Sequence, residues 1–167
     1  ISSGHTSGKT MQVLLENTPL ESIDSPNKKG VTPLLIAAER DDVALAKALL
    51  RRGASGTVCD STTGTSPLAI ASFCGSTKVL TDVFFKDDEL TSNLINLPNS
   101  SGCTPLWLAT RAGRADVVRL LLDAGAKPFL ADNEGKTPSD IAEKYERTEI
   151  VPLLKEADVP LNIVIST

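Results

Sequence analysis

Apolar residues recur along the chain at the spacing of short amphipathic helices. In the clearest case Val117, Val118 and Leu121 fall on one face of a helix. Small residues, here Ala109 and Thr110, precede the apolar segments and would allow a first, shorter helix to lie close to its neighbours. Turns between the two helices of each pair are expected at Asp41, Gly75, Gly113 and Glu146. The pattern therefore predicts pairs of helices joined by turns.

A short motif opens each helix pair: Gly, then any residue, then Thr or Ser, then Pro. The Thr or Ser positions are 32, 66, 104 and 137, so that 34, 38 and 33 residues separate them. Gly supplies the positive φ of a tight turn, the hydroxyl caps a helix, and Pro suits the first helical position. The turn, the cap and the helix start occur together at four places in the chain, which indicates a tandem repeat.

The segment from Gly102 to Ala126, GCTPLWLATRAGRADVVRLLLDAGA, resembles an ankyrin repeat through its whole length. The repeat length of about 33 residues, the T-P-L-x-x-A start and the L-L-L-x-x-G-A end all match. The resemblance covers residues 9–157. It implies an all-α repeat solenoid, in which each unit is a β-turn followed by two antiparallel helices. Hairpin tips would project from one edge of the stack.

The repeat divides the chain into an ankyrin domain at 1–158 and a tail at 159–167. The expected units are a partial one at 1–29, full ones at 30–63, 64–101 and 102–134, and a terminal one at 135–158. Only the second helix, at 10–16, is clear in the first unit. Charged residues in the last unit would supply the polar outer face that the exposed end of a stack needs.

Three departures from the family pattern stand out. The histidine of the family's T-P-L-H motif is replaced in every unit, by Leu35, Ala69, Trp107 and Asp140. The third unit is about five residues too long, with the excess near 86–92. Pro152 either removes a backbone hydrogen bond from the last helix or delays its start.

Composition favours a folded, non-catalytic domain. Of the 167 residues 41% are hydrophobic and the net charge is −4, which supports neither a nucleic-acid nor a membrane-surface role. No apolar run approaches the roughly 20 residues that span a bilayer. Three cysteines and one histidine suit neither a disulfide framework nor a structural zinc site. Reduced thiols indicate the cytoplasm, or alternatively the nucleus. The start without Met suggests a domain of a larger protein.

No segment carries the residues of an active site. The stretch 3–10 ends in Gly-Lys-Thr like a phosphate-binding loop, but Ser3 replaces the first Gly and no strand precedes it. His5 has no identifiable nucleophile or carboxylate partner. The acidic run at 87–89 lacks the spacing of a calcium loop. We therefore expect no enzyme activity, no cofactor and no metal.

The resemblance implies two sets of partner-binding residues. At the hairpin tips these are Lys28, Lys29, Thr63, Ser101 and Glu134; at the groove-facing ends of the first helices they are Glu39, Arg40, Phe73, Arg111, Lys144 and Tyr145. Trp107 has two interpretations, packing between repeats or an anchor for a partner on the concave face, since Trp is frequent in interface hot spots. Such a groove would suit an apolar anchor flanked by acidic residues.

The function expected from the resemblance is protein–protein interaction, in one domain of a scaffolding, adaptor or signalling protein. The partner would be a protein or peptide of unknown identity, and the isolated domain would be a monomer. The alternative is a nucleotide or small-ligand sensor that regulates an attached domain. Trp107 and Tyr145 would then stack on a base while nearby cations hold the phosphate.

Overall fold

The computed structural model describes residues 23–157, and within that range the secondary structure is helical, with no strand. The first helices are α2 (Pro33–Glu39), α4 (Pro67–Cys74), α7 (Pro105–Ala112) and α9 (Pro138–Lys144). The second helices are α3 (Val43–Arg51), α5 (Thr77–Asp82), α8 (Ala115–Asp123) and α10 (Ile150–Ala157). The helix expected at 10–16, His5, the segment 3–10 and the tail at 159–167 lie outside the described residues.

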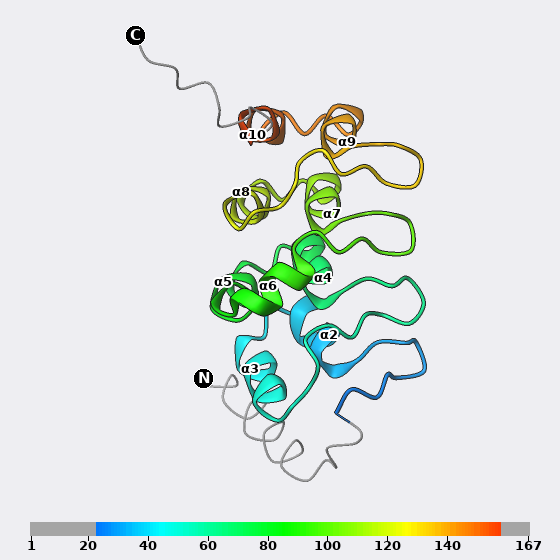
Figure 1. The fold of residues 1–167 in the computed structure, drawn as a ribbon, viewed down its shortest axis with the longest axis vertical. Helices are drawn as coiled ribbons and strands as arrows, with labels where there is room; N and C mark the ends of the chain where they lie inside the picture. Colours follow the sequence, from blue (N-terminus) through cyan, green and yellow to red (C-terminus); the bar gives the residue numbers. More distant parts are fainter. Residues whose placement is uncertain (1–22, 158–167) are drawn as a thin grey trace, which may run out of the picture.

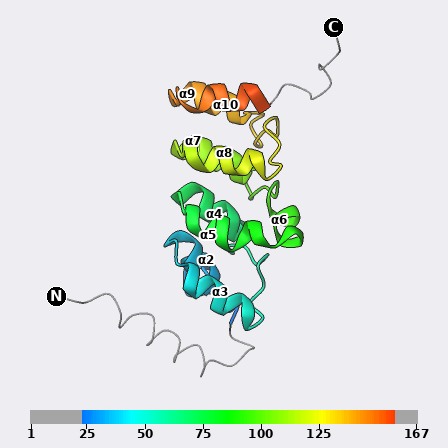
Figure 2. The same cartoon turned by 90° about the vertical axis from the view of Figure 1, so that its left-hand side faces the viewer.

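The helix pairs stack in two columns (Figure 1). The inner column holds α2, α4, α7 and α9, each in contact with the next, and the outer column holds α3, α5, α8 and α10. Hairpins project from the edge of the inner column, and Figure 2 shows successive pairs lying side by side along the stack. The expected all-α repeat solenoid is confirmed. None of the helices in the described range is long and apolar enough to cross a membrane.

Each inner helix begins where the sequence predicts. The hydroxyls of Thr32, Ser66, Thr104 and Thr137 accept from the third backbone N–H beyond them, at 3.4, 3.2, 3.3 and 3.3 Å. Pro follows each cap, where its missing N–H costs no bond. In α9 the cap is reciprocal, because the Asp140 carboxylate also accepts from the Thr137 N–H at 2.8 Å.

The expected turns between helices all contain a residue with positive φ. Gly75 and Gly113 have φ of 85° and 74°, and the non-glycine residues Asp41 and Glu146 have φ of 56° and 54°. Asp tolerates this left-handed conformation better than most residues. The side chain of Asp41 also accepts from the Val79 N–H at 2.8 Å, so the turn of one unit binds the outer helix of the next.

Hydrogen bonds join neighbouring units at both edges of the stack. At the hairpin edge Ser61, Ser100 and Asn133 donate their N–H to the carbonyls of Gly30, Thr63 and Ser101, at 3.1, 2.9 and 3.0 Å. At the helix-turn edge the side chains of Ser76, Arg114 and Arg147 donate to the carbonyls of Glu39, Phe73 and Arg111, at 3.4, 3.2 and 2.8 Å. The same bond thus recurs between successive units.

The apolar core runs through the stack rather than being confined to one unit. Its fully buried members are contributed by every helix pair in the described range, and include Leu34, Leu49, Leu68, Leu80, Leu106, Leu121, Ile150 and Leu154. No unit could bury its own apolar face alone, so folding of each depends on its neighbours.

The extra residues of the third unit form an additional helix. After α5 the chain turns through the 3₁₀ helix η2 (Phe84–Lys86) into α6 (Asp88–Leu94), which projects beyond the outer column in Figure 2. Phe84 is fully buried and fixes the start of this excursion in the core. The excess therefore begins slightly before the predicted stretch at 86–92 and extends to Leu94.

Pro152 follows the second of its two predicted outcomes. The last outer helix begins at Ile150, four residues after the turn residue Glu146, whereas α8 begins two residues after Gly113. The late start places Pro152 in the first turn of α10, where backbone N–H groups have no acceptor within the helix. The proline therefore costs no helical hydrogen bond.

Asp60 stabilises its hairpin in a way that depends on pH. One carboxylate oxygen accepts the N–H groups of Thr62 and Thr63, at 2.9 and 2.8 Å, and both hydroxyls. Burial alone would raise the pKa of Asp60, but these hydrogen bonds outweigh it and lower the pKa. Because the folded pKa is depressed, this stability is present above the unfolded pKa of about 3.9 and lost as pH falls through the folded value.

We expect Asp60→Ala to lower the free energy of unfolding by about 1–3 kcal/mol at neutral pH, since it removes the hydrogen bonds of Thr62 and Thr63 to a charged acceptor. Asp60→Asn should cost less, because Asn27 and Asn99 accept equivalent backbone bonds in other hairpins. Urea unfolding at pH 7 and pH 3 measures the free energy of unfolding of the wild type and of both variants. The wild-type advantage over Asp60→Asn should shrink at pH 3; an advantage independent of pH would contradict the assigned role of the charge.

Candidate functional site

The predicted partner-binding residues occupy the hairpin tips and the ends of the inner helices. All of them are exposed except Trp107. The large apolar side chains on this surface are Phe73 and Tyr145, 44% and 40% exposed. Exposed aromatic rings at fixed positions on a rigid stack are suited to contact a partner.

A concavity of about 420 Å³ lies between the hairpins and inner helices of the last two units. It brings together six of the predicted residues: Ser101, Trp107, Arg111, Glu134, Lys144 and Tyr145. Phe73, Glu39 and Arg40 lie outside it, on the ends of earlier inner helices, and Lys28, Lys29 and Thr63 lie on earlier hairpins. The sequence therefore predicted six of the residues that line this concavity, but not that they form it.

Trp107 packs between units and does not act as an exposed anchor. Only 6% of its surface is exposed, and its indole N–H donates to the carbonyl of Lys136 at 3.1 Å. The ring thus joins α7 to the following hairpin. The interpretation of Trp107 as an anchor for a partner is corrected, because its position just inside α7 directs the side chain under that hairpin.

Two cations lie close to aromatic rings in the concavity. The Arg111 guanidinium is 5.9 Å from the centroid of Trp107, and the Lys144 ammonium is 5.5 Å from that of Tyr145. Both distances are within the range of cation–π attraction. Trp107 therefore contributes to the surface indirectly, by supporting Arg111 from below.

The concavity is lined by more cations than carboxylates. Arg111, Lys136 and Lys144 line it together with Asp132 and Glu134. The Asp132 carboxylate already accepts the N–H groups of Glu134 and Lys136, at 2.9 and 2.8 Å. These two hydrogen bonds hold Asp132 in the hairpin. The surface offered to a ligand is therefore more basic than the whole chain.

Cys103 lines the concavity but is not poised as a nucleophile. Burial raises the pKa of its thiol, and the Asp132 carboxylate adds to the rise. The thiol is therefore protonated at neutral pH, which removes the reactive thiolate. In the part of the chain that the structure describes, no three His, Cys, Asp or Glu side chains are grouped to hold a metal ion.

The lining also includes residues that the sequence did not predict as partner-binding, among them Asp132 and Ile141. Asp132 repeats a position held by Asn27, Asp60 and Asn99, which accept backbone bonds within the hairpins. When the four hairpin sequences are aligned, each has Asn or Asp at this position. Ile141 gives no comparable signal, because a buried apolar residue on an inner helix resembles any core position.

Comparison with known proteins agrees with the geometry. A family model described as "Ankyrin repeats (3 copies)" matches residues 81–163, and one described as "Ankyrin repeat" matches residues 29–61. Dauer abnormal formation protein 25 of Caenorhabditis elegans is 32% identical over 74% of this chain and 30% of its own length. Tyrosine-protein kinase HTK16 of Hydra vulgaris is 25% identical over 85% of this chain and 18% of its own length.

A third relative is the mitochondrial disaggregase of Bos taurus, 28% identical over 81% of this chain. The chain spans less than a third of the length of each of these three proteins. The similarity therefore concerns the repeat region and does not extend to the rest of each relative.

Trp107→Phe should lower the free energy of unfolding by about 1–3 kcal/mol, since it removes a hydrogen bond between units and leaves a small cavity. Chemical unfolding of the chain measures the change. Phe73→Ala is the matched control, because its ring is largely exposed, and should change the free energy by less than about 0.5 kcal/mol. Equal effects of the two substitutions would contradict the packing role of Trp107.

Proposed function

Since this chain belongs to the ankyrin repeat family, we propose that it is a protein-interaction domain of a larger scaffolding, adaptor or signalling protein. Ankyrin repeats bind protein partners in general, and the described residues contain no catalytic domain. The concavity lined by Arg111, Lys144 and Tyr145 is the observation that carries the proposal. It combines an exposed ring with cations on a preordered backbone, so binding loses little conformational entropy.

The ligand that fits this concavity is a peptide segment with an apolar anchor beside acidic residues. The anchor would contact Tyr145, and carboxylates would pair with Arg111 and Lys144. Phe73, on the end of α4, would extend the apolar contact toward the preceding unit. The exposed tips Lys28, Lys29, Thr63, Ser101 and Glu134, with Glu39 and Arg40, complete the proposed surface.

The proposal includes the organisation and location of the domain. We keep the unit boundaries at 30–63, 64–101, 102–134 and 135–158, since each contains an inner and an outer helix, to which the unit at 64–101 adds η2 and α6. The domain is proposed to be monomeric and to act in the cytoplasm or nucleus. Cys59, Cys74 and Cys103 support that location, because all three are free thiols.

Selection of random dodecamer peptides displayed on phage tests the ligand chemistry. The purified chain should enrich sequences with an apolar residue next to Asp or Glu. Binding of the selected peptide should fall about tenfold in Arg111→Glu and in Lys144→Glu, because each replaces an attraction by a repulsion. Arg119→Glu, an equal charge change on α8, should leave binding unchanged. Enriched peptides without acidic residues would contradict the proposal.

A nucleotide ligand is the weaker candidate, because Trp107, one of its two stacking rings, is buried. We expect millimolar ATP or GTP to leave the melting temperature of the domain unchanged. A ligand that bound the folded state at that concentration would raise the temperature by mass action. A rise in differential scanning fluorimetry that disappears in Tyr145→Ala would restore the nucleotide alternative.

A further inference from the structure

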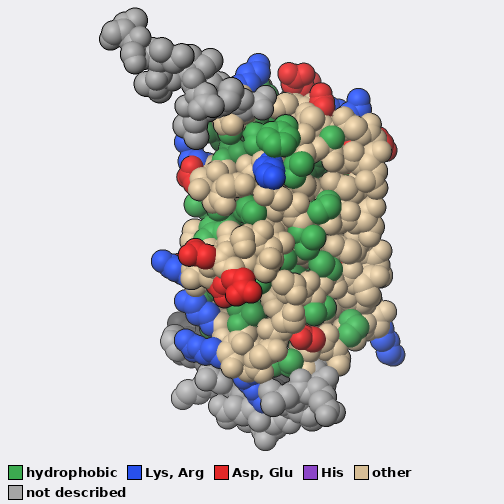
Figure 3. Space-filling view, viewed as in Figure 1, with side chains coloured by type: hydrophobic (Ala, Val, Ile, Leu, Met, Phe, Trp, Pro, Cys, Tyr) green, Lys and Arg blue, Asp and Glu red, His purple; other side chains and the backbone are tan. Residues whose placement is uncertain are grey.

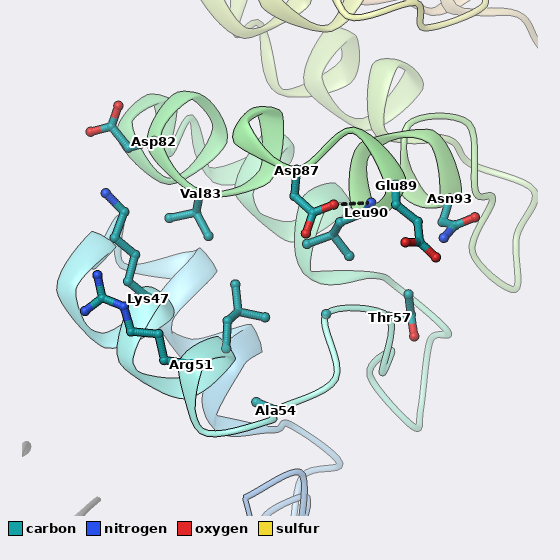
Figure 4. Close-up of a pocket in the computed structure, with 12 residues that line it drawn as sticks. Lys47, Arg51, Ala54, Thr57, Asp82, Val83, Asp87, Glu89, Leu90 and Asn93 are labelled. Carbon is teal, nitrogen blue, oxygen red and sulfur yellow. Dashed lines mark hydrogen bonds between the residues drawn. The ribbon is translucent and has the colours of Figure 1, made fainter.

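A second concavity lies on the outer side of the stack, away from the hairpin tips. It has a volume of about 530 Å³ and is enclosed by α3 on one side and by the segment from α5 to α6 on the other (Figure 4). In Figure 3 acidic and basic side chains gather on the left of the molecule, where Figure 1 shows the outer column and α6. We refer to this concavity as the outer cleft.

The excess residues of the third unit form one side of the outer cleft. Asp87 caps α6 by accepting the Leu90 N–H at 2.9 Å, and the Thr91 hydroxyl donates to the Phe84 carbonyl at 2.6 Å. Leu90 packs on the bare backbone of Gly56, where an added Cβ would come within 2.5 Å of a Leu90 methyl carbon. Contacts with η2 and the segment after α3 thus fix the position of α6 beside the cleft.

The two sides of the outer cleft carry opposite charges. Lys47 and Arg51, one turn apart on α3, form the basic side; on the other side Asp82 of α5 lies beside Lys47, and Glu89 of α6 lies farther along, near Asn93 (Figure 4). Among residues 23–157 no ion pair joins the two sides. Leu50, Val83 and Leu90 supply apolar surface between them.

The basic side is particular to α3. At the matching positions of α8 the chain has Arg119 and Asp123 in place of Lys47 and Arg51, so the second cation is replaced by a carboxylate. The paired cations and the inserted helix therefore occur together, at the same pair of units.

We propose that the outer cleft binds a peptide segment of a second partner, in which one apolar side chain lies between an acidic and a basic residue. The acidic residue pairs with Lys47 and Arg51, the basic residue pairs with Glu89 farther along the cleft, and the apolar side chain contacts Leu50, Val83 and Leu90. Charge complementarity on both sides selects this ligand over one of uniform charge. The outer cleft shares no lining residue with the concavity of the last two units, so occupation of one site leaves the other exposed.

Chemical-shift perturbation of the ¹⁵N- and methyl-labelled chain tests the outer cleft. The probes are three blocked pentapeptides, with central Asp-Leu-Lys, Ser-Leu-Ser and Lys-Leu-Lys. We expect Asp-Leu-Lys to bind at least fivefold more tightly than the other two and to shift the Gly56 amide and the Leu90 methyl groups. Added salt should weaken the binding, because the contacts are exposed ion pairs. Shifts confined to other surfaces, or equal affinity for Ser-Leu-Ser, would overturn the proposal.

The double variant Lys47→Glu, Arg51→Glu makes both sides acidic and should reverse the preference. It should bind Lys-Leu-Lys more tightly than Asp-Leu-Lys, a gain of binding that misfolding would not produce. Arg119→Glu is the control for charge on an outer helix and should bind like the wild type. Arg111→Glu should also leave binding at the outer cleft unchanged, so failure of the groove and failure of this cleft are distinguishable. A double variant with unchanged preference would overturn the proposal.

Discussion

The stack depends on one recurring interaction, a hydrogen bond from each unit to a backbone carbonyl of the unit before it. At the helix-turn edge the last turn of an inner helix exposes carbonyls that have no acceptor role within the helix. Arg114 and Arg147 satisfy two of them, on Phe73 and Arg111. Because these bonds run between units, no unit is complete alone. The apolar core follows the same rule, since its buried leucines are shared across helix pairs.

This interaction also explains why particular glycines are needed. A Cβ on Gly75 would lie 3.1 Å from the Arg114 side chain, and one on Gly113 would lie 3.1 Å from that of Arg147. Both glycines therefore permit a left-handed turn and the close approach of the next unit's arginine. Asp41 has a left-handed φ without being glycine, and there the later unit again donates, but from the Val79 backbone N–H to the Asp41 side chain rather than from a side chain to a carbonyl.

Local signals in the sequence predicted most of the fold, whereas contacts between units were beyond them. A hydroxyl before Pro33 or Pro105 caps a helix through bonds within a few residues, so five letters suffice to place it. The Trp107 ring donates to a hairpin carbonyl 29 residues later in the chain. Neither the repeat spacing nor the composition predicts that contact. The excess residues near 86–92 could be counted from the sequence. The cleft beside α6 could not be predicted in this way, because it depends on the packing of Leu90 on Gly56 in the preceding unit. Site residues were therefore predicted as positions, and their grouping came from the structure.

The bonds between units also determine which residues are available for binding. Glu39, Phe73 and Arg111 each give their carbonyl to the following unit, while their side chains remain exposed at the groove. The backbone carbonyl at these positions holds the stack together, and it accepts the same hydrogen bond whatever side chain the residue carries. Substitution there can change the binding surface at little cost in stability, because the structural role belongs to main-chain atoms. Trp107 differs from Arg111 because its side chain, through the indole N–H, donates the structural hydrogen bond. The side chain at position 107 is therefore not free to vary.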